Sequence, residues 1–219
     1  IMRSALFYSD DYKEIEKKIK VFLNAQSDFL SPRTISSTRA AGDAIQELLA
    51  DNLQSILGNQ AKEYIAKFPR RSMADIAFSD KNGFYYAIDV KTHRLNTRFN
   101  MPNLTSVNRL AKFYEDDKHY FVTLMIAYNI EGTRVIVERV HFVPIEFLSW
   151  TCLTIGALGW GQIQIANSNR IDILVHSRKA WMLELCSKLF DFYPAEIGKI
   201  KKRIDRFKKV QTNWLAKKD

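Results

Sequence analysis

Long hydrophobic runs are absent from this sequence of 219 residues. The most apolar segments, such as Tyr120–Tyr128 with the sequence YFVTLMIAY, are too short to span a bilayer. The first residues also lack the charged, apolar and small-residue regions of an export signal. We therefore expect a protein that has no membrane partner and is not exported.

Cysteine is scarce as well. Cys152 and Cys186 are the only two, and their positions fit no metal-ligand spacing. Both lie in apolar segments, so we expect buried thiols that form no disulfide. Such cysteine usage is typical of a reducing compartment, and the sequence predicts a cytoplasmic location.

Acidic residues are outnumbered by basic ones, with 24 Asp and Glu against 33 Lys and Arg, which gives a net charge of +9. A basic surplus favours a polyanionic partner such as nucleic acid, although many basic proteins bind none. The basic residues gather in segments 32–39, 67–72, 91–98 and 199–211. The last segment is typical either of the solvated face of an amphipathic helix or of an arm that contacts phosphates.

Hydrophobic periodicity predicts a chain of helices and strands without repeats or linkers. Turn residues at Asp80–Gly83 and Glu131–Gly132 join four of the strands into two hairpins. These elements indicate an α/β (α+β) fold with a central mixed or mostly antiparallel β-sheet flanked by helices. We expect one domain over residues 1–219 with a helical C-terminal region over about residues 178–219. The helices are predicted over residues 11–30, 37–57, 103–117, 177–193 and 194–218, and the strands over 73–79, 83–91, 119–130, 133–143 and 161–168.

Three charged residues interrupt the apolar strands of the first hairpin. Asp89 and Lys91 are two residues apart, so their side chains lie on one face of their strand. Asp75 lies near the outer end of the preceding strand, and the hairpin turn brings it beside Asp89. Two adjacent carboxylates repel each other and are usually held together by a cation.

Carboxylate oxygens favour a hard divalent ion, most simply Mg²⁺. A lysine nearby can contact the same phosphate or assist the attacking water, so metal and lysine together suit the hydrolysis of a phosphodiester. The plainer interpretation is that Asp75 starts a strand and that Asp89 and Lys91 form a surface pair, because Asp-x-Lys alone is a common pattern. The second acid across the hairpin and the basic composition favour the catalytic interpretation.

Five stretches carry a wider pattern: ADIAF, YAIDVKTHRLNTRFNMPNLTSVNRLAK, AAGDAIQELL, GQIQIANS and SRKAWMLE, in patches from about Arg39 to Leu185. Together they resemble the type II restriction endonucleases of the PD-(D/E)xK superfamily, in particular members that leave blunt ends. The resemblance implies the restriction-endonuclease-like fold and a homodimer. It also implies Mg²⁺-dependent hydrolysis of double-stranded DNA at a short palindromic site, with Mn²⁺ as a possible substitute and 5′-phosphates on the products.

The resemblance assigns roles to several residues of this chain. It makes Asp75 and Asp89 the metal-binding acids and Lys91 the catalytic lysine. It makes Asp43 an accessory acid, but Glu47 lies one helical turn later on the same side and competes for that role. Asp43 is equally typical of an acid that is favoured near a helix N-terminus. Ala74 stands where the family has a proline that serves only to begin the strand.

The segment Thr92–Asn103, with the sequence THRLNTRFNMPN, contains arginines and amides but no acid. Arg94 and Arg98 can contact phosphates, and Asn100 and Asn103 can reach base edges. The alternative is an ordinary connection in which Asn103 caps the following helix.

Other contacts are expected on both sides of this loop. We expect His93 to contact a phosphate or a base rather than a metal, because no second histidine is spaced to join it. The resemblance places Phe99 and Asn100 where side chains wedge into the DNA stack, and Asn103 where a side chain reads a base. Gln162 and Gln164 alternate with apolar residues, so one face of their strand could face DNA or the active site or, on an edge strand, face water.

Two further functions stay open on the sequence alone. A repair or recombination nuclease, such as a junction resolvase, could use the same acids and lysine and would recognise DNA structure. A DNA-binding module on a decayed nuclease fold would need no catalytic residues, and the presence of Asp75, Asp89 and Lys91 argues against it.

Overall fold

The computed structural model describes residues 3–26, 29–66, 68–69, 72–95, 97, 102–166 and 170–218. The chain divides into two compact units, Ile1–Val175 and His176–Asp219. The first unit contains two β-sheets and most of the helices, and the second contains one long helix. No helix in the described part of the chain combines the length and the hydropathy that a membrane span requires.

The larger sheet is mixed, as the sequence predicted, and it has five strands. Its strand order is β1-β2-β3-β5-β6. Only β3 and β5 run parallel, and the other neighbours are antiparallel. The two predicted hairpins are confirmed, whereas the short strand β1 was not predicted. The bounds are β1 Glu63–Ile65, β2 Ile76–Ser79, β3 Tyr85–Arg94, β5 His119–Glu131 and β6 Arg134–Pro144.

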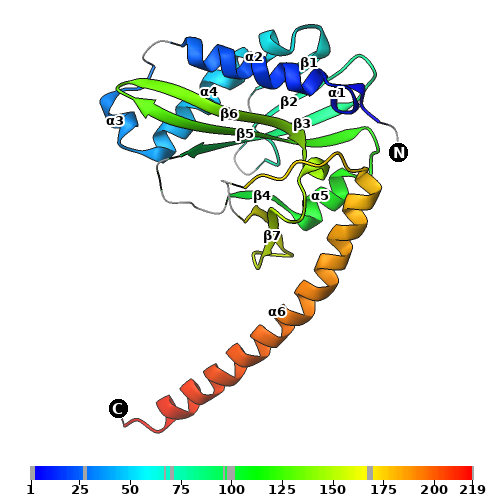
Figure 1. The fold of residues 1–219 in the computed structure, drawn as a ribbon. Helices are drawn as coiled ribbons and strands as arrows, with labels where there is room; N and C mark the ends of the chain where they lie inside the picture. The colour runs from blue at the N-terminus through cyan, green and yellow to red at the C-terminus, as the bar shows by residue number, and fades with distance from the viewer. Residues whose placement is uncertain are drawn as a thin grey trace. The chain divides into compact units, whose positions relative to one another are not determined.

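Helices cover one face of this sheet (Figure 1). Helix α4, Thr38–Leu57, is capped by Ser37, whose Oγ accepts a hydrogen bond from Ala40 N at 3.2 Å, and it buries Ile45 and three leucines on its inner side. Gly42 lets α4 approach β3 closely, because a Cβ at this position would lie 2.5 Å from Thr92 Oγ1. The first core helix is therefore anchored against the strand that carries Asp89 and Lys91.

Helix α2, Asp11–Ala25, closes the outer edge of the sheet and ends before the predicted Leu30. Its polar side chains, spaced four residues apart, bond the backbone of β6, which would otherwise expose an unpaired strand edge. The two short helices α1, Ala5–Tyr8, and α3, Pro32–Ile35, complete this layer. The edge contacts are Glu16 Oε1 with Phe142 N at 2.8 Å, Lys20 Nζ with Glu138 O at 2.9 Å and Asn24 Oδ1 with Val137 N at 2.7 Å.

A second, three-stranded sheet lies with helix α5 on the other face of the large sheet (Figure 1). Its strand order is β4-β8-β7, with β4 Asn103–Ser106, β7 Leu153–Gly156 and β8 Gln162–Ile165. The helix predicted from residue 103 begins only at Val107, where Ser106 Oγ accepts from Arg109 N at 3.3 Å, and α5 ends at Phe113. Asn103 therefore does not cap this helix. The edge-strand alternative for Gln162 and Gln164 is also wrong, since β8 is the central strand.

The second unit is one helix, α6, over Arg178–Leu215. The sequence predicted two helices separated before Pro194, because proline lacks a backbone donor and clashes with the preceding turn. Pro194 lies inside α6, and the helix continues through it. The expectation of two buried thiols is half right: Cys152 is buried, but Cys186 on α6 is exposed.

Candidate active site

The end of β2 fixes the first acid of the candidate site. The last residue pair of the β2–β3 ladder is Ile76 with Ile88, and β3 continues beyond it to Arg94. Just before β2, Asp75 N donates to Ile88 O at 2.9 Å, and Asp75 Oδ2 accepts from Val90 N at 2.8 Å. If β2 began further toward the N-terminus, one of its backbone carbonyls would accept the hydrogen bond from Val90 N. The Asp75 carboxylate accepts that hydrogen bond instead. This contact holds Asp75 beside Asp89.

Asp89 is a buried acid with one paired oxygen. Its Oδ1 accepts from Lys91 Nζ at 2.6 Å. Its Oδ2 is buried and has no hydrogen-bond partner among the described residues. A buried acceptor without a partner is costly, so this atom calls for a donor or a cation.

The surroundings of Asp89 penalise its charged form. Its pKa is raised to about 7, and burial is the largest cause. The charge and the hydrogen bond of Lys91 lower this pKa, and the charge of nearby Asp75 raises it. A cation between the two carboxylates would lower this pKa and complete the environment of Oδ2. The pair is therefore arranged at an energetic cost that a bound cation would relieve.

The residues present fit an oxygen-coordinated ion. Among the described residues, no three His, Cys, Asp or Glu side chains come together as a metal cluster. Two carboxylates cannot close a tetrahedral zinc site, but they suit Mg²⁺, which is commonly bound by one or two carboxylates and keeps several waters. The orphaned Asp89 Oδ2 and the neighbouring Asp75 carboxylate are the atoms available for it.

An open hollow of about 630 Å³ lies beside β3, a volume in the range of sites for small molecules. Lys91 and His93 line it from β3, and Asp43 lines it from α4. Glu47 is exposed and is not among the described residues that line the hollow. The geometry therefore favours Asp43 over Glu47 as the accessory acid. Asp43 lies 3.9 Å from Arg39 in an exposed ion pair.

Arg94 has a contact within the fold. Its Nη1 donates to Ile35 O at 2.9 Å, which ties the end of β3 to α3. Arg94 also lines the hollow, so a phosphate contact by its guanidinium stays a prediction. Arg98, Phe99 and Asn100 lie outside the described residues, and their roles stay predictions.

The three-stranded sheet brings together the other predicted DNA contacts. Asn103 on β4 and Gln164 on β8 are paired in register, and Gln164 Nε2 donates to Asn103 Oδ1 at 2.6 Å. Gly156 on β7 makes room for Gln164, because a Cβ there would lie 2.6 Å from Gln164 Oε1. Gln162 lies on the same face, while Ile163 between them is buried. The amides thus form a polar row held by backbone pairing.

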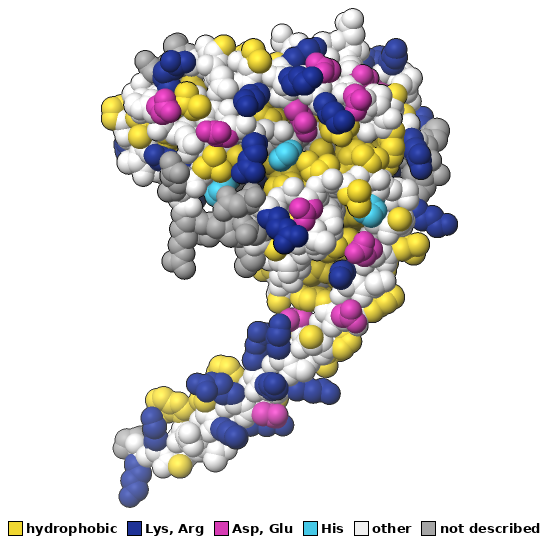
Figure 2. Space-filling model, in the orientation of Figure 1, with side chains coloured by type: hydrophobic (Ala, Val, Ile, Leu, Met, Phe, Trp, Pro, Cys, Tyr) yellow, Lys and Arg dark blue, Asp and Glu magenta, His cyan; other side chains and the backbone are white. Residues whose placement is uncertain are grey.

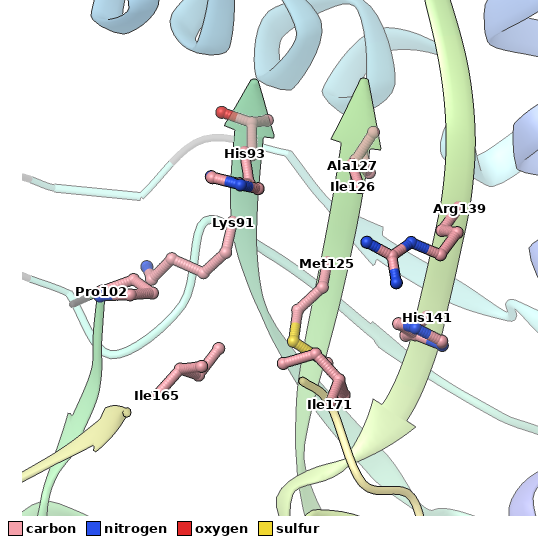
Figure 3. Close-up of a pocket in the computed structure, with 11 residues that line it drawn as sticks. Lys91, His93, Pro102, Met125, Ile126, Ala127, Arg139, His141, Ile165 and Ile171 are labelled. Carbon is pink, nitrogen blue, oxygen red and sulfur yellow. The ribbon is translucent and has the colours of Figure 1, made fainter. Parts of the chain in front are cut away.

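A smaller cavity of about 40 Å³ lies on the face of the large sheet (Figure 3). Lys91 and His93 reach it from β3, and Arg139 and His141 reach it from β6. Burial and the charge of Arg139 lower the pKa of His141. This volume can hold a few water molecules but not a nucleotide.

Thr123, Arg139 and His141 were not predicted as site residues. Thr123 is fully buried and pairs in register with Asp89, and its Oγ1 has no hydrogen-bond partner among the described residues. A threonine inside the apolar run Tyr120–Tyr128 was the available signal. Arg139 and His141 show only the ordinary polar alternation of a strand, which marks no site.

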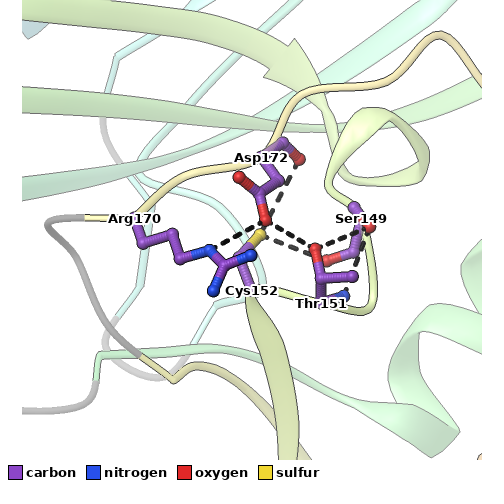
Figure 4. Close-up of polar contacts among 5 residues, drawn as sticks. All are labelled: Ser149, Thr151, Cys152, Arg170 and Asp172. Atoms are coloured by element: carbon purple, nitrogen blue, oxygen red, sulfur yellow. Dashed lines mark hydrogen bonds and ion pairs between the residues drawn. The ribbon is translucent and has the colours of Figure 1, made fainter.

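Cys152 belongs to a structural cluster (Figure 4). Its Sγ lies 3.1 Å from Ser149 O, and burial raises the pKa of its thiol. Thr151 Oγ1 donates to Asp172 Oδ2 at 2.6 Å, and Arg170 Nε lies 3.3 Å from the same oxygen. These contacts join the segment before β7 to the segment after β8. A thiol with a raised pKa is a poor nucleophile, so the cluster does not compete with the Asp75–Asp89–Lys91 site.

Comparison with known proteins assigns the chain to no group. No family model matches it, and no curated protein is similar to it at a significant level.

Proposed function

We propose that the protein is a Mg²⁺-dependent type II restriction endonuclease of the PD-(D/E)xK superfamily. It would cut double-stranded DNA at a short palindromic site and leave blunt ends with 5′-phosphates. The observation that carries the proposal is the grouping of Asp75, Asp89 and Lys91, with one buried Asp89 oxygen that lacks a partner. The mixed sheet flanked by helices agrees with the fold that the sequence resemblance implies.

Asp75 and Asp89 would hold the metal. When bound, Mg²⁺ would neutralise charge on the scissile phosphate and lower the pKa of a water molecule. Asp75 is kept in place by the Val90 amide, and Asp89 by its position inside the sheet. Both acids are thus fixed by the backbone of β3 before any DNA binds.

Lys91 would supply a positive charge on the face of β3 that also carries Asp89. Its ammonium group bonds Asp89 Oδ1 at 2.6 Å and also lines the open hollow. A phosphate in this hollow would share or replace the Asp89 contact and receive charge stabilisation from Lys91 as negative charge develops. Asp43, on the α4 side of the hollow, would assist in positioning water or a second cation.

DNA recognition would come from elements next to this centre. The segment after β3 and the polar row of Asn103, Gln162 and Gln164 offer amides for base edges, and His93, Arg94 and Arg98 offer positive charge for phosphates. Two copies of the chain would act on the two equivalent phosphates of a palindromic site, because a two-fold dimer matches the symmetry of the DNA.

Plasmid digestion with Mg²⁺, followed by sequencing of the fragment ends, tests the proposal. We expect discrete fragments whose blunt ends share one palindromic sequence. Cleavage of branched DNA alone would instead assign the site to a junction resolvase. Absence of cleavage with both Mg²⁺ and Mn²⁺ on DNA of varied sequence would contradict nuclease function.

A further inference from the structure

Helix α6 carries a narrow row of exposed hydrophobic side chains, which we call the seam. Its members follow each other at alternating intervals of three and four residues, and Gln211 and Trp214 continue the same spacing. This is the heptad pattern of a coiled coil, in which two apolar positions repeat every seven residues. The seam consists of Phe190, Tyr193, Ile197, Ile200, Ile204 and Phe207.

The seam is open to solvent along its length. Phe190 is 74% exposed, Phe207 67%, and Ile197, Ile200 and Ile204 about half. Contiguous exposed apolar surface of this kind usually marks an interface. Figure 2 shows yellow hydrophobic side chains between dark-blue Lys and Arg side chains along α6.

The shape and charge of α6 narrow the choice of partner. A membrane surface would favour a wide apolar face, whereas the seam is only two positions wide in each heptad. Nucleic acid could contact the basic side chains but would leave the apolar seam uncovered. A partner helix with the same spacing covers such a seam, because side chains of each helix insert between those of the other.

A second copy of α6 in parallel orientation gives mostly compatible flanking pairs. In that arrangement Glu196, which also bonds Lys199 of its own helix at 2.6 Å, faces Lys201 of the partner subunit in an attractive pair. Val210 faces Leu215 of the partner subunit, which extends the apolar contact. Arg203 faces Lys208 of the partner subunit, and this like-charge pair opposes the association only weakly, because both side chains are exposed to water.

We propose that α6 forms a parallel, two-stranded coiled coil with α6 of a second copy of this chain, and that the seam is its core. The inference rests on the exposed heptad pattern and the flanking residues, not on the candidate active site. It names the element that would join two protomers, whatever reaction they perform.

The oligomeric state of the 219-residue chain tests whether the seam is a dimer interface. Light scattering during size-exclusion chromatography should give twice the mass of one chain. Ile204→Glu should raise the dimer dissociation constant by roughly thirtyfold or more, because it places a charge in the core of the interface. Thr212→Glu adds the same charge to the same helix away from the seam and should leave the dimer intact. Circular dichroism should show that both variants keep their helix content.

A bismaleimide cross-linker tests the orientation. Cys186 is exposed and lies on the seam spacing four residues before Phe190, whereas Cys152 is buried. In a parallel pair the two Cys186 thiols lie opposite each other, so we expect a covalent dimer that Cys186→Ser abolishes. A dimer without this cross-link would overturn the parallel arrangement.

Two results would overturn the seam itself. One is a wild-type protein that is monomeric. This includes the case in which Ile204→Glu destabilises the monomer, because the seam would then pack against another part of its own chain. The other is a dimer that Ile204→Glu leaves unchanged. None of these readouts uses DNA cleavage, so failure of the nuclease proposal and failure of the seam are distinguishable.

Discussion

Two lysine–carboxylate pairs of this protein have the same length and different surroundings. Lys91 with Asp89 on β3 and Lys17 with Glu14 on α2 are both 2.6 Å apart. The side chains of Lys91 and Asp89 are 26% and 11% exposed, whereas those of Lys17 and Glu14 are 70% and 62% exposed. Distance alone therefore does not distinguish a candidate catalytic pair from a solvated helix pair.

Burial distinguishes the two ion pairs. Water screens the exposed helix pair, and such pairs add little to stability. In the β3 pair, burial works against the ionised carboxylate, and Lys91 offsets only part of that cost. A pair kept in spite of this cost is a reasonable place to look for function, since perturbed carboxylates concentrate at active sites.

The largest difference is expected from the two lysines. Lys91→Met should slow DNA cleavage by roughly 10²–10³-fold or more, because it removes positive charge from the reacting phosphate. Lys17→Met removes a lysine from an ion pair of the same length and should leave the cleavage rate unchanged. Lys91→Arg should not restore the rate, since the planar guanidinium does not replace a compact ammonium. Equal rates for the Lys91→Met and Lys17→Met proteins would reduce Asp89–Lys91 to a structural pair.

Stability should depend on pH through the buried pair. The pKa of Asp89 is raised from 3.8 to about 7, so the folded protein holds a proton that the unfolded chain has lost between these values. The free energy of unfolding therefore falls as pH rises from about 4 to about 7, by at most ~4 kcal/mol for this group. Asp89→Asn should remove the part of this pH dependence that comes from Asp89. The measurement is the free energy of unfolding by denaturant at several pH values, without metal.

Glu16 provides a second contribution of the same sign. Burial raises its pKa from 4.5 to about 7, against the opposing hydrogen bond from Phe142 N. Glu16→Gln keeps an acceptor for that amide and should flatten the remaining slope. A stability curve that rises from pH 4 to pH 7 in the metal-free protein would contradict both assignments.

Metal binding should offset the free-energy cost of ionising the buried Asp89 carboxyl. At pH 8, Mg²⁺ at about 100 times its dissociation constant should stabilise the wild type by ~2.7 kcal/mol. Asp89→Asn should lose this effect, and Glu14→Gln, in the exposed pair, should retain it. Wild-type affinity should weaken below pH 7, because Asp89 must release its proton to bind the ion. Equal thermal shifts in Asp89→Asn and wild type would place the ion elsewhere.

The smallest effect concerns the polar row on the three-stranded sheet. Gly156→Val should displace Gln164 from its contact with Asn103 and reduce discrimination at one base pair by ~1–3 kcal/mol. Asn103→Ala should act at the same base pair. Gly198→Ala, where an added Cβ meets nothing within 4 Å, is a control for the loss of a glycine elsewhere in the chain. Unchanged cleavage of single-mismatch sites by Gly156→Val would remove this row from DNA recognition.

Local patterns predicted the elements that hold the site, and long-range contacts decided the rest. The Asp80–Gly83 turn and strand alternation were sufficient to place Asp75 beside Asp89. The sequence does not show that the Asp75 carboxylate would accept the Val90 amide or that Asp89 Oδ2 would be buried without a partner, since both depend on how β3 extends past β2. Residues 103–106 were predicted as the start of a helix over residues 103–117, but pairing with β8 makes them a strand.

Asp89→Ala gives the most direct test of the central claim, which is that Asp75, Asp89 and Lys91 form a Mg²⁺-dependent nuclease centre. The measurement is the rate of plasmid cleavage by wild type and by Asp89→Ala with Mg²⁺, together with their affinities for the same DNA. We predict that wild type yields discrete fragments, and that Asp89→Ala binds this DNA but cuts it several orders of magnitude more slowly, since the metal's charge stabilisation is worth several kcal/mol. Cleavage by Asp89→Ala at the wild-type rate would contradict the assignment.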